Sequence, residues 1–145
     1  MRKKILIVLV IIVVIQFISP EKNLSADERF AISTVMEVPT QVQELLKVSC
    51  NDCHSNSTIY PWYSDIAPVS WFLARHVNQG KEHLNFSEWV QYNTHQRDHI
   101  KNDLEEVLKD HEMPLKSYVW LHPEAAMTPE QVDLLLEWVA TIETE

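Results

Sequence analysis

Glycine is almost absent from this chain: Gly80 is the only one in 145 residues, against seven prolines. A β-rich fold needs many tight turns, and most of those turns require glycine. Helices joined by bends that proline marks need far less of it. We therefore predict an all-α fold, in a chain whose length suits one ordinary domain with its own core.

The N-terminus has a basic start followed by an apolar run. Arg2, Lys3 and Lys4 precede the uncharged residues 5–20, which as one helix would measure about 24 Å against a hydrocarbon layer of about 30 Å. This length fits either an uncleaved anchor or a cleaved signal peptide. No A-x-A cleavage site follows directly, so we favour a membrane anchor.

In both cases the positive end stays inside and the remainder of the chain is exported. We therefore predict a protein of the cytoplasmic membrane that faces the periplasm, or a periplasmic one if the leader is cleaved. The expected organisation is an anchor or signal segment at 1–20, a linker with about one helical turn at 21–39, and a helical domain at 40–145.

Apolar positions at helical spacing predict four helices after residue 39. A capping box of Thr40 and Gln43 begins the first helix, which leads into Cys50. Residues 55–68 and 111–127 hold turn formers and prolines, and we expect them to be loops. The second helix is predicted to begin at Pro68 and to end at Gly80. Ser87 is the predicted cap of a third helix, which runs through Leu108. The last helix is predicted to begin with Thr128, Pro129 and Gln131.

The chain is acidic, with a formal net charge of −9. Phosphates would be repelled by such a surface, so nucleic acid is not expected as a partner. The charge suits a partner protein with a basic face, and it also serves simple solubility.

The only two cysteines lie in the pentapeptide Cys50-Asn51-Asp52-Cys53-His54. C-x-x-C-H is the attachment signature of c-type haem. Two thiols at this spacing can each add to one vinyl group of the same porphyrin, and the adjacent histidine is carried under the iron as an axial ligand. We predict one covalent haem c per chain, bound by Cys50 and Cys53 with His54 on the iron.

Three other interpretations of the cysteine pair stay open. It could form a structural disulfide in an oxidising compartment. It could be a thioredoxin-like redox pair, although the βαβ pattern of that fold is absent. It could be half of a zinc site, although a second ligand pair at finger spacing is missing.

The second axial ligand is predicted to be Met113. It lies between Glu112 and Pro114 in the predicted loop before the last helix, where the chain can fold over the haem face opposite His54. The neighbouring proline stiffens that loop and so lowers the entropy cost of holding a weak thioether on iron. Packing in the core is the alternative role for this methionine. Met127 and then His122 follow as candidates, ahead of Met36, His76, His83, His95, His99 and His111.

Several further motifs carry a family resemblance. They are Cys50-Asn51-Asp52-Cys53-His54-Ser55-Asn56, Tyr60-Pro61-Trp62-Tyr63-Ser64, Ala67-Pro68-Val69-Ser70-Trp71, Leu84-Asn85-Phe86-Ser87-Glu88-Trp89, Glu112-Met113-Pro114-Leu115 and His122-Pro123-Glu124-Ala125.

Over residues 35–140 the chain resembles the haem-binding domain family of small exported proteins akin to cytochrome c, and its leader resembles that family's membrane anchor. The resemblance implies a cytochrome c-like helical fold in which Cys50, Cys53 and His54 attach haem. It also supports Met113 as the distal ligand.

An electron carrier is the expected function, with no catalytic residues and one-electron transfer to a redox partner protein. The alternative is a five-coordinate haem protein that senses gas or peroxide, or an enzyme; a module without haem is the third hypothesis. We further expect His54 to donate its other ring N–H to a carbonyl of the 55–68 loop, with Pro61 as the acceptor. Five aromatic side chains are expected to shield the haem: Trp62, Tyr63, Trp71, Trp89 and Trp120.

Overall fold

The computed structural model describes residues 1–144, and within them it contains helices and no strand. The all-α prediction is therefore confirmed. The α-helices are α1 (Arg2–Ile15), α2 (Thr40–Ser49), α3 (Asn51–His54), α4 (Val69–His83), α5 (Thr94–Lys109), α6 (Lys116–Leu121) and α7 (Pro129–Ala140). The 3-10 turns are η1 (Ile32–Thr34), η2 (Trp62–Asp65), η3 (Phe86–Gln91) and η4 (Pro123–Ala125).

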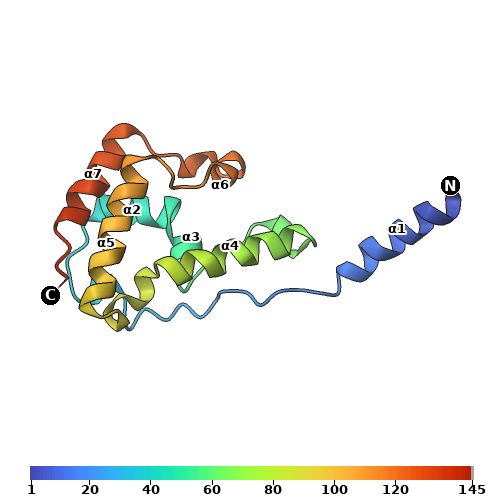
Figure 1. Ribbon diagram of the computed structural model, residues 1–145, viewed down its shortest axis with the longest axis horizontal. Coiled ribbons are helices and arrows are strands. Elements are labelled where there is room, and N and C mark those ends of the chain that lie inside the picture. The colour runs from blue at the N-terminus through green and yellow to red at the C-terminus, as the bar shows by residue number, and fades with distance from the viewer. Residues whose placement is uncertain (145) are drawn as a thin grey trace.

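The core lies where α5 and α7 run side by side and α2 packs against α7 (Figure 1). Each of these helices turns an apolar stripe inward, at the spacing that one helix face requires. Val42, Leu135 and Val139 are almost completely buried there. Burial of such a side chain stabilises the folded state by about 1.5–3 kcal/mol. The packing of α2, α5 and α7 is therefore a main source of the stability of the fold.

Two helices begin with complete capping boxes. In α7, Thr128 and Gln131 bond each other's backbone N–H groups and Pro129 occupies the first turn, as the sequence predicts. In α5 the box is formed by Asn93 and Gln96. The prediction of Ser87 as the cap was wrong, because residues 86–91 form the separate turn η3 and the helix starts only at Thr94.

Two other predicted helix boundaries were also wrong. Pro39 is the N-cap of α2, and the Gln43 side chain donates to the Val38 carbonyl at 2.8 Å instead of closing a box with Thr40. Gly80 does not end α4, which continues to His83. The predicted loop at 111–127 contains α6 and η4, which the sequence pattern did not indicate.

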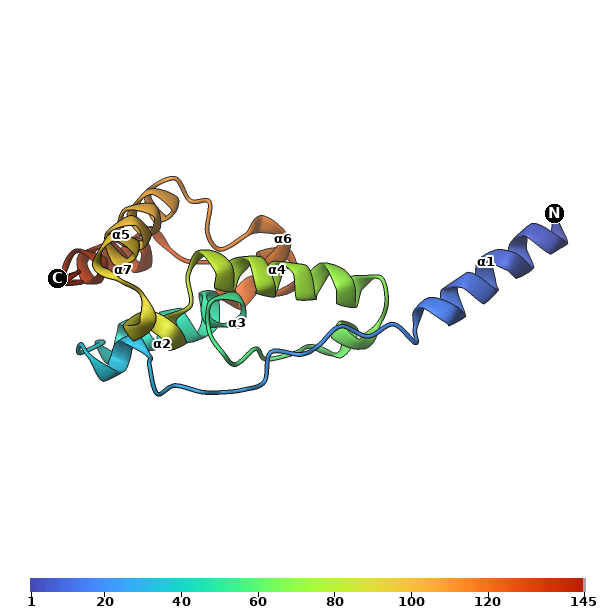
Figure 2. The same cartoon turned by 60° about the horizontal axis from the view of Figure 1, so that its bottom comes forward.

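Helix α1 projects away from the body in both views (Figure 1, Figure 2), and its apolar side chains lie mostly in the open. It covers residues 2–15. No helix within residues 1–144 has both the length and the apolar character needed to cross a membrane. The predicted transmembrane anchor is therefore not confirmed.

Residues 21–39 run along the body rather than hanging free. The Asn23 side chain donates to the Ser55 carbonyl at 2.7 Å, and the Ala26 N–H donates to the Asn56 carbonyl at 2.9 Å. Glu28 accepts from the Ser87 hydroxyl at 2.7 Å. This segment, which contains the turn η1, therefore binds the chain just after the Cys-x-x-Cys-His motif to the region around η3.

Candidate functional site

The motif begins at a break between two helices. Helix α2 ends at Ser49, and Cys50 takes non-helical angles (φ −127°, ψ −45°) before α3 starts. The Cys50 carbonyl accepts both the Cys53 N–H at 3.1 Å and the His54 N–H at 3.0 Å. A single tight turn thus holds both sulfurs and the imidazole next to one another.

Helix α4 packs directly against this turn. A Cβ placed on Gly80 would lie 2.6 Å from the Cys53 carbonyl oxygen, a distance that real Cβ atoms essentially never show. Gly80 is therefore needed for the close approach of two backbones and not as a helix end.

The imidazole of His54 is oriented by a backbone carbonyl. Its Nδ1 lies 2.9 Å from the Leu84 carbonyl oxygen, so the acceptor is Leu84 and the prediction of Pro61 was wrong. A carbonyl can only accept, so Nδ1 carries the proton and Nε2 keeps a free lone pair. Burial lowers the pKa of His54, which favours the neutral form that a metal requires.

The peptide group between Leu84 and Asn85 is fixed on both sides. Its carbonyl accepts from His54, and its N–H donates to the Tyr92 hydroxyl at 2.9 Å. The Asn85 side chain is buried and donates to the Asn56 Oδ1 at 2.9 Å. The acceptor that orients His54 is therefore itself held by polar side chains from two other segments.

Cys50 and Cys53 are free thiols, not joined to each other. Burial raises the pKa of Cys50 to about 12 and that of Cys53 to about 11. Thioredoxin-like cysteines have lowered pKa values because the thiolate is the attacking form. The structure therefore favours neither the disulfide nor the thiol-redox interpretation.

Helix α6 is attached to the motif by a hydrogen bond. The Tyr118 hydroxyl donates to Asp52 Oδ2 at 2.8 Å, and its ring stacks on His122 with the centroids 4.5 Å apart. His122 Nε2 lies 2.7 Å from the Tyr63 hydroxyl, while its Nδ1 lies 3.3 Å from Glu124. Both ring nitrogens of His122 thus face side chains, which disfavours it as an iron ligand.

Met113 is half-buried in the segment between α5 and α6. Met127 packs against the hydrophobic core. His99 pairs with Asp103 on the surface of α5, and His95 is exposed on the same helix. No hydrogen bond or ion pair of residues 1–144 joins Met113 to the motif, so its pairing with His54 stays a prediction.

The aromatic side chains are not arranged as the sequence suggested. Trp89 is a core residue with 2% exposure, whereas Trp62 and Trp120 are 80% and 82% exposed. The Tyr63 hydroxyl lies 2.7 Å from His122 Nε2. The burial of Trp89 is compatible with packing in the core and with shielding of a haem, so the aromatic shield stays a prediction, and the exposure of Trp62 and Trp120 requires another explanation.

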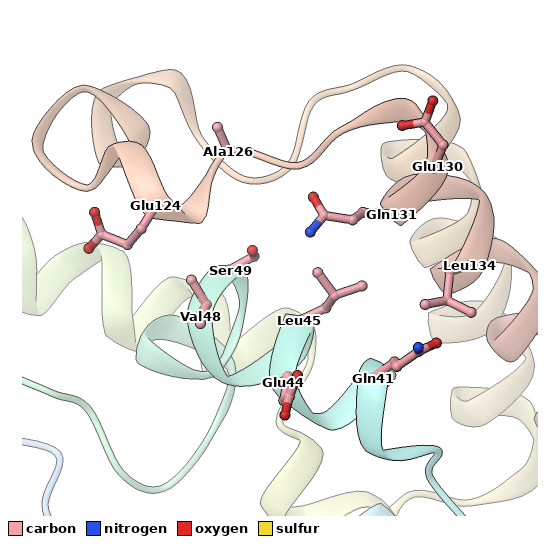
Figure 3. A pocket seen from close by; sticks show the side chains of 10 residues that line it. All are labelled: Gln41, Glu44, Leu45, Val48, Ser49, Glu124, Ala126, Glu130, Gln131 and Leu134. Atoms are coloured by element: carbon pink, nitrogen blue, oxygen red, sulfur yellow. The ribbon is translucent and has the colours of Figure 1, made fainter.

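A cavity of about 460 Å³ lies beside the motif, between α2, α7 and the chain near η4 (Figure 3). Ser49 and Leu45 point toward it from α2, with Gln131 on the α7 side (Figure 3). Three carboxylates are among its lining residues, and Cys50, Cys53, His54 and Met113 are not. The lining is Gln41, Glu44, Leu45, Val48, Ser49, Glu124, Ala126, Glu130, Gln131 and Leu134.

Within residues 1–144 no group of three or more histidine, cysteine, aspartate or glutamate side chains could hold a metal ion. The zinc interpretation therefore finds no support there. The fold and the motif together define an all-α protein in which one turn carries two free thiols and a histidine whose lowered pKa favours its neutral form.

The chain belongs to the haem-binding domain family, whose model matches residues 10–141. This match confirms the resemblance found in the sequence and indicates haem as the cofactor. No curated protein and no solved structure matches the chain. The proposed division at residues 20 and 39 stays a prediction.

Proposed function

We propose that this protein carries one covalently bound haem c and transfers single electrons. The observation that supports this most directly is the hydrogen bond from His54 Nδ1 to the Leu84 carbonyl at 2.9 Å. It leaves Nε2 as a ready ligand beside two reduced thiols on the same turn.

Each motif residue has a defined role in this proposal. Cys50 and Cys53 would hold the haem through two thioethers, each formed when an S–H group adds across one vinyl double bond, with sulfur on one carbon and the hydrogen on the other. His54 would hold the iron through Nε2, while the hydrogen bond from Nδ1 to the Leu84 carbonyl keeps the ring from rotating. The haem supplies the one-electron change between ferric and ferrous iron.

Met113 is proposed as the second axial ligand, which makes the protein an electron carrier and not an enzyme. Its half-buried position in a segment stiffened by Pro114 supports this assignment. Histidine and methionine together saturate the iron and raise its reduction potential. A five-coordinate site, by contrast, would give a high-spin spectrum and bind carbon monoxide or cyanide rapidly.

We further propose that the body is exported and held at the periplasmic face of the cytoplasmic membrane by α1. The exposed apolar side chains of that helix and the three basic residues before them support this location. The net charge of −9 suits a redox partner with a basic face.

The test is the intact mass of the exported protein after c-type maturation. The wild-type chain should show one haem increment that survives denaturation, and the same mass reveals whether the leader is retained. Cys50→Ala with Cys53→Ala should abolish the covalent increment, whereas the control Ser57→Ala, an exposed residue after the motif, should keep it. A colourless wild-type protein without the increment would refute the proposal.

A further inference from the structure

The exposed apolar side chains outside α1 include a group on the turn η2 and the first turns of α4. These two elements pack against each other. Trp62 is the most exposed of the group. We call this group the aromatic corner, and it consists of Trp62, Ile66, Val69, Trp71 and Phe72.

The end of α1 is clasped to this corner. The Gln16 side chain forms two hydrogen bonds with the Ala67 backbone, donating to its oxygen at 3.1 Å and accepting from its N–H at 3.0 Å. The Trp71 indole N–H donates to the Ile18 carbonyl at 2.7 Å. Both views show α1 leaving the molecule at this end of α4 (Figure 1, Figure 2).

The corner is also nearly free of charge, although the protein is strongly acidic. Residues 66–74 contain no charged side chain. Asp65, just before them, is paired with Lys22 at 2.7 Å. Glu21 is next to Lys22 in the sequence, and Arg75 follows the corner on α4. An acidic body is repelled by anionic lipid headgroups, so a neutral face is the one that can approach them.

We propose that the aromatic corner rests on the surface of a lipid bilayer while α1 embeds beside it. This inference deepens the proposed function and depends on the membrane association of α1. Tryptophan side chains favour such an interface because the ring is apolar and the N–H stays near water. A lipid surface is favoured over a partner protein because the end of α1 is hydrogen-bonded to the corner. A bilayer that accommodates the apolar side chains of α1 would therefore also contact the corner.

This contact would fix the orientation of the body on the membrane. The clasp alone leaves α1 joined to the body at one end. A second contact through Trp62 and Phe72 removes the remaining freedom to tilt. The long axis of α4 then sets how far the motif lies from the bilayer, because α3 packs along that helix.

The test uses two positions of equal exposure on the full-length holoprotein: Phe72 at 57% and Val35 at 58%. Val35 follows η1, which packs on η3 beyond the far end of α4. In the proposed holoprotein the native sulfurs are thioethers, so Phe72→Cys and Val35→Cys each add the only free thiol. Each variant is labelled with a nitroxide and mixed with vesicles of phosphatidylcholine and phosphatidylglycerol.

We expect the ratio of oxygen to nickel-chelate accessibility to rise several-fold at position 72 and to stay unchanged at position 35. Phe72→Asp should also weaken vesicle binding by about tenfold or more, since a buried aromatic contact is replaced by a charge, and Val35→Asp should leave it unchanged. If the protein binds vesicles but position 72 remains accessible to water, the proposed membrane contact of the aromatic corner is refuted and the anchoring by α1 is not. A chain that does not bind vesicles refutes the proposed anchoring, and the corner with it.

Discussion

Gly80 and Cys53, 27 positions apart in the sequence, lie at a close contact between α4 and the Cys-x-x-Cys-His motif. A Cβ on Gly80 would meet the Cys53 carbonyl oxygen at 2.6 Å and the Cys53 Cβ at 3.0 Å. The neighbour is backbone, which cannot move aside as a flexible side chain can. The single glycine of the chain is thus placed where α4 leaves no room for a Cβ beside Cys53.

Gly80→Ala should therefore destabilise the protein even though alanine favours helices by about 1 kcal/mol. We expect a net loss of about 1–3 kcal/mol in the free energy of unfolding, because α4 must shift away from the motif. Denaturant unfolding of the holoprotein measures it. Asn78→Ala, at an exposed position of the same helix, should be neutral or slightly stabilising, and an equal loss there would contradict the steric argument.

In the proposed holoprotein, Tyr92→Phe should change the reduction potential of the haem although the substitution removes no proposed iron ligand. The variant leaves the buried Asn85 N–H without its acceptor, at a cost of about 1–3 kcal/mol in the free energy of unfolding. The peptide that accepts from His54 then becomes less well held, so the histidine becomes a weaker donor and the reduction potential should rise. Spectroelectrochemistry measures the shift.

A matched control exists for this variant. Tyr60 accepts the Asn23 N–H at 2.8 Å, a bond of the same kind in the segment that runs along the body. Tyr60→Phe should lower stability by a similar amount and leave the potential unchanged. If both variants shift the potential equally, Tyr92 has no special positioning role.

Met113→Ala should abolish the sulfur-to-iron charge-transfer band of the ferric protein and lower its reduction potential, because the thioether that favours ferrous iron is lost. Met127→Ala is the control: that half-buried methionine packs against the core, so its loss should cost about 0.5–3 kcal/mol of stability and keep the band. The opposite pattern would transfer the ligand role to Met127.

Alkaline pH should loosen the attachment of α6. Burial, reinforced by the hydrogen bond to Asp52, raises the pKa of Tyr118 above its usual 10.0. The folded phenol keeps its proton where the unfolded one loses it. The folded state then binds more protons, and the free energy of unfolding falls as pH rises above about 10.

Tyr118→Phe should make that decline shallower, as measured by denaturant unfolding at several alkaline pH values. It should also cost about 1.5–3 kcal/mol at neutral pH, since a hydrogen bond to a carboxylate is lost. Trp120→Phe, an exposed position on the same helix, should keep the wild-type pH dependence. An unchanged slope in Tyr118→Phe would show that other groups cause it.

Residues three apart in the sequence predicted the α7 capping box of Thr128 and Gln131 correctly, but the same spacing was wrong for Thr40 and Gln43, and the Asn93–Gln96 box of α5 was missed. The boundaries at Ser87 and Gly80 were missed because their roles depend on distant segments: Ser87 bonds Glu28, and Gly80 contacts Cys53. Helix α6 was missed because its short run of residues, 116–121, shows no clear helical period.

The amino-acid sequence by itself determined the helical class, through the scarcity of glycine, and the family, through the Cys50–His54 pentapeptide and its companion motifs. A motif of fixed spacing and a helical periodicity are local properties, so both can be recognised from the sequence alone. Only the tertiary structure decided that Leu84 orients His54, that Tyr118 bonds Asp52, and that Gln16 clasps Ala67. Each of these contacts joins segments at least 30 residues apart, and their meeting depends on how whole helices pack.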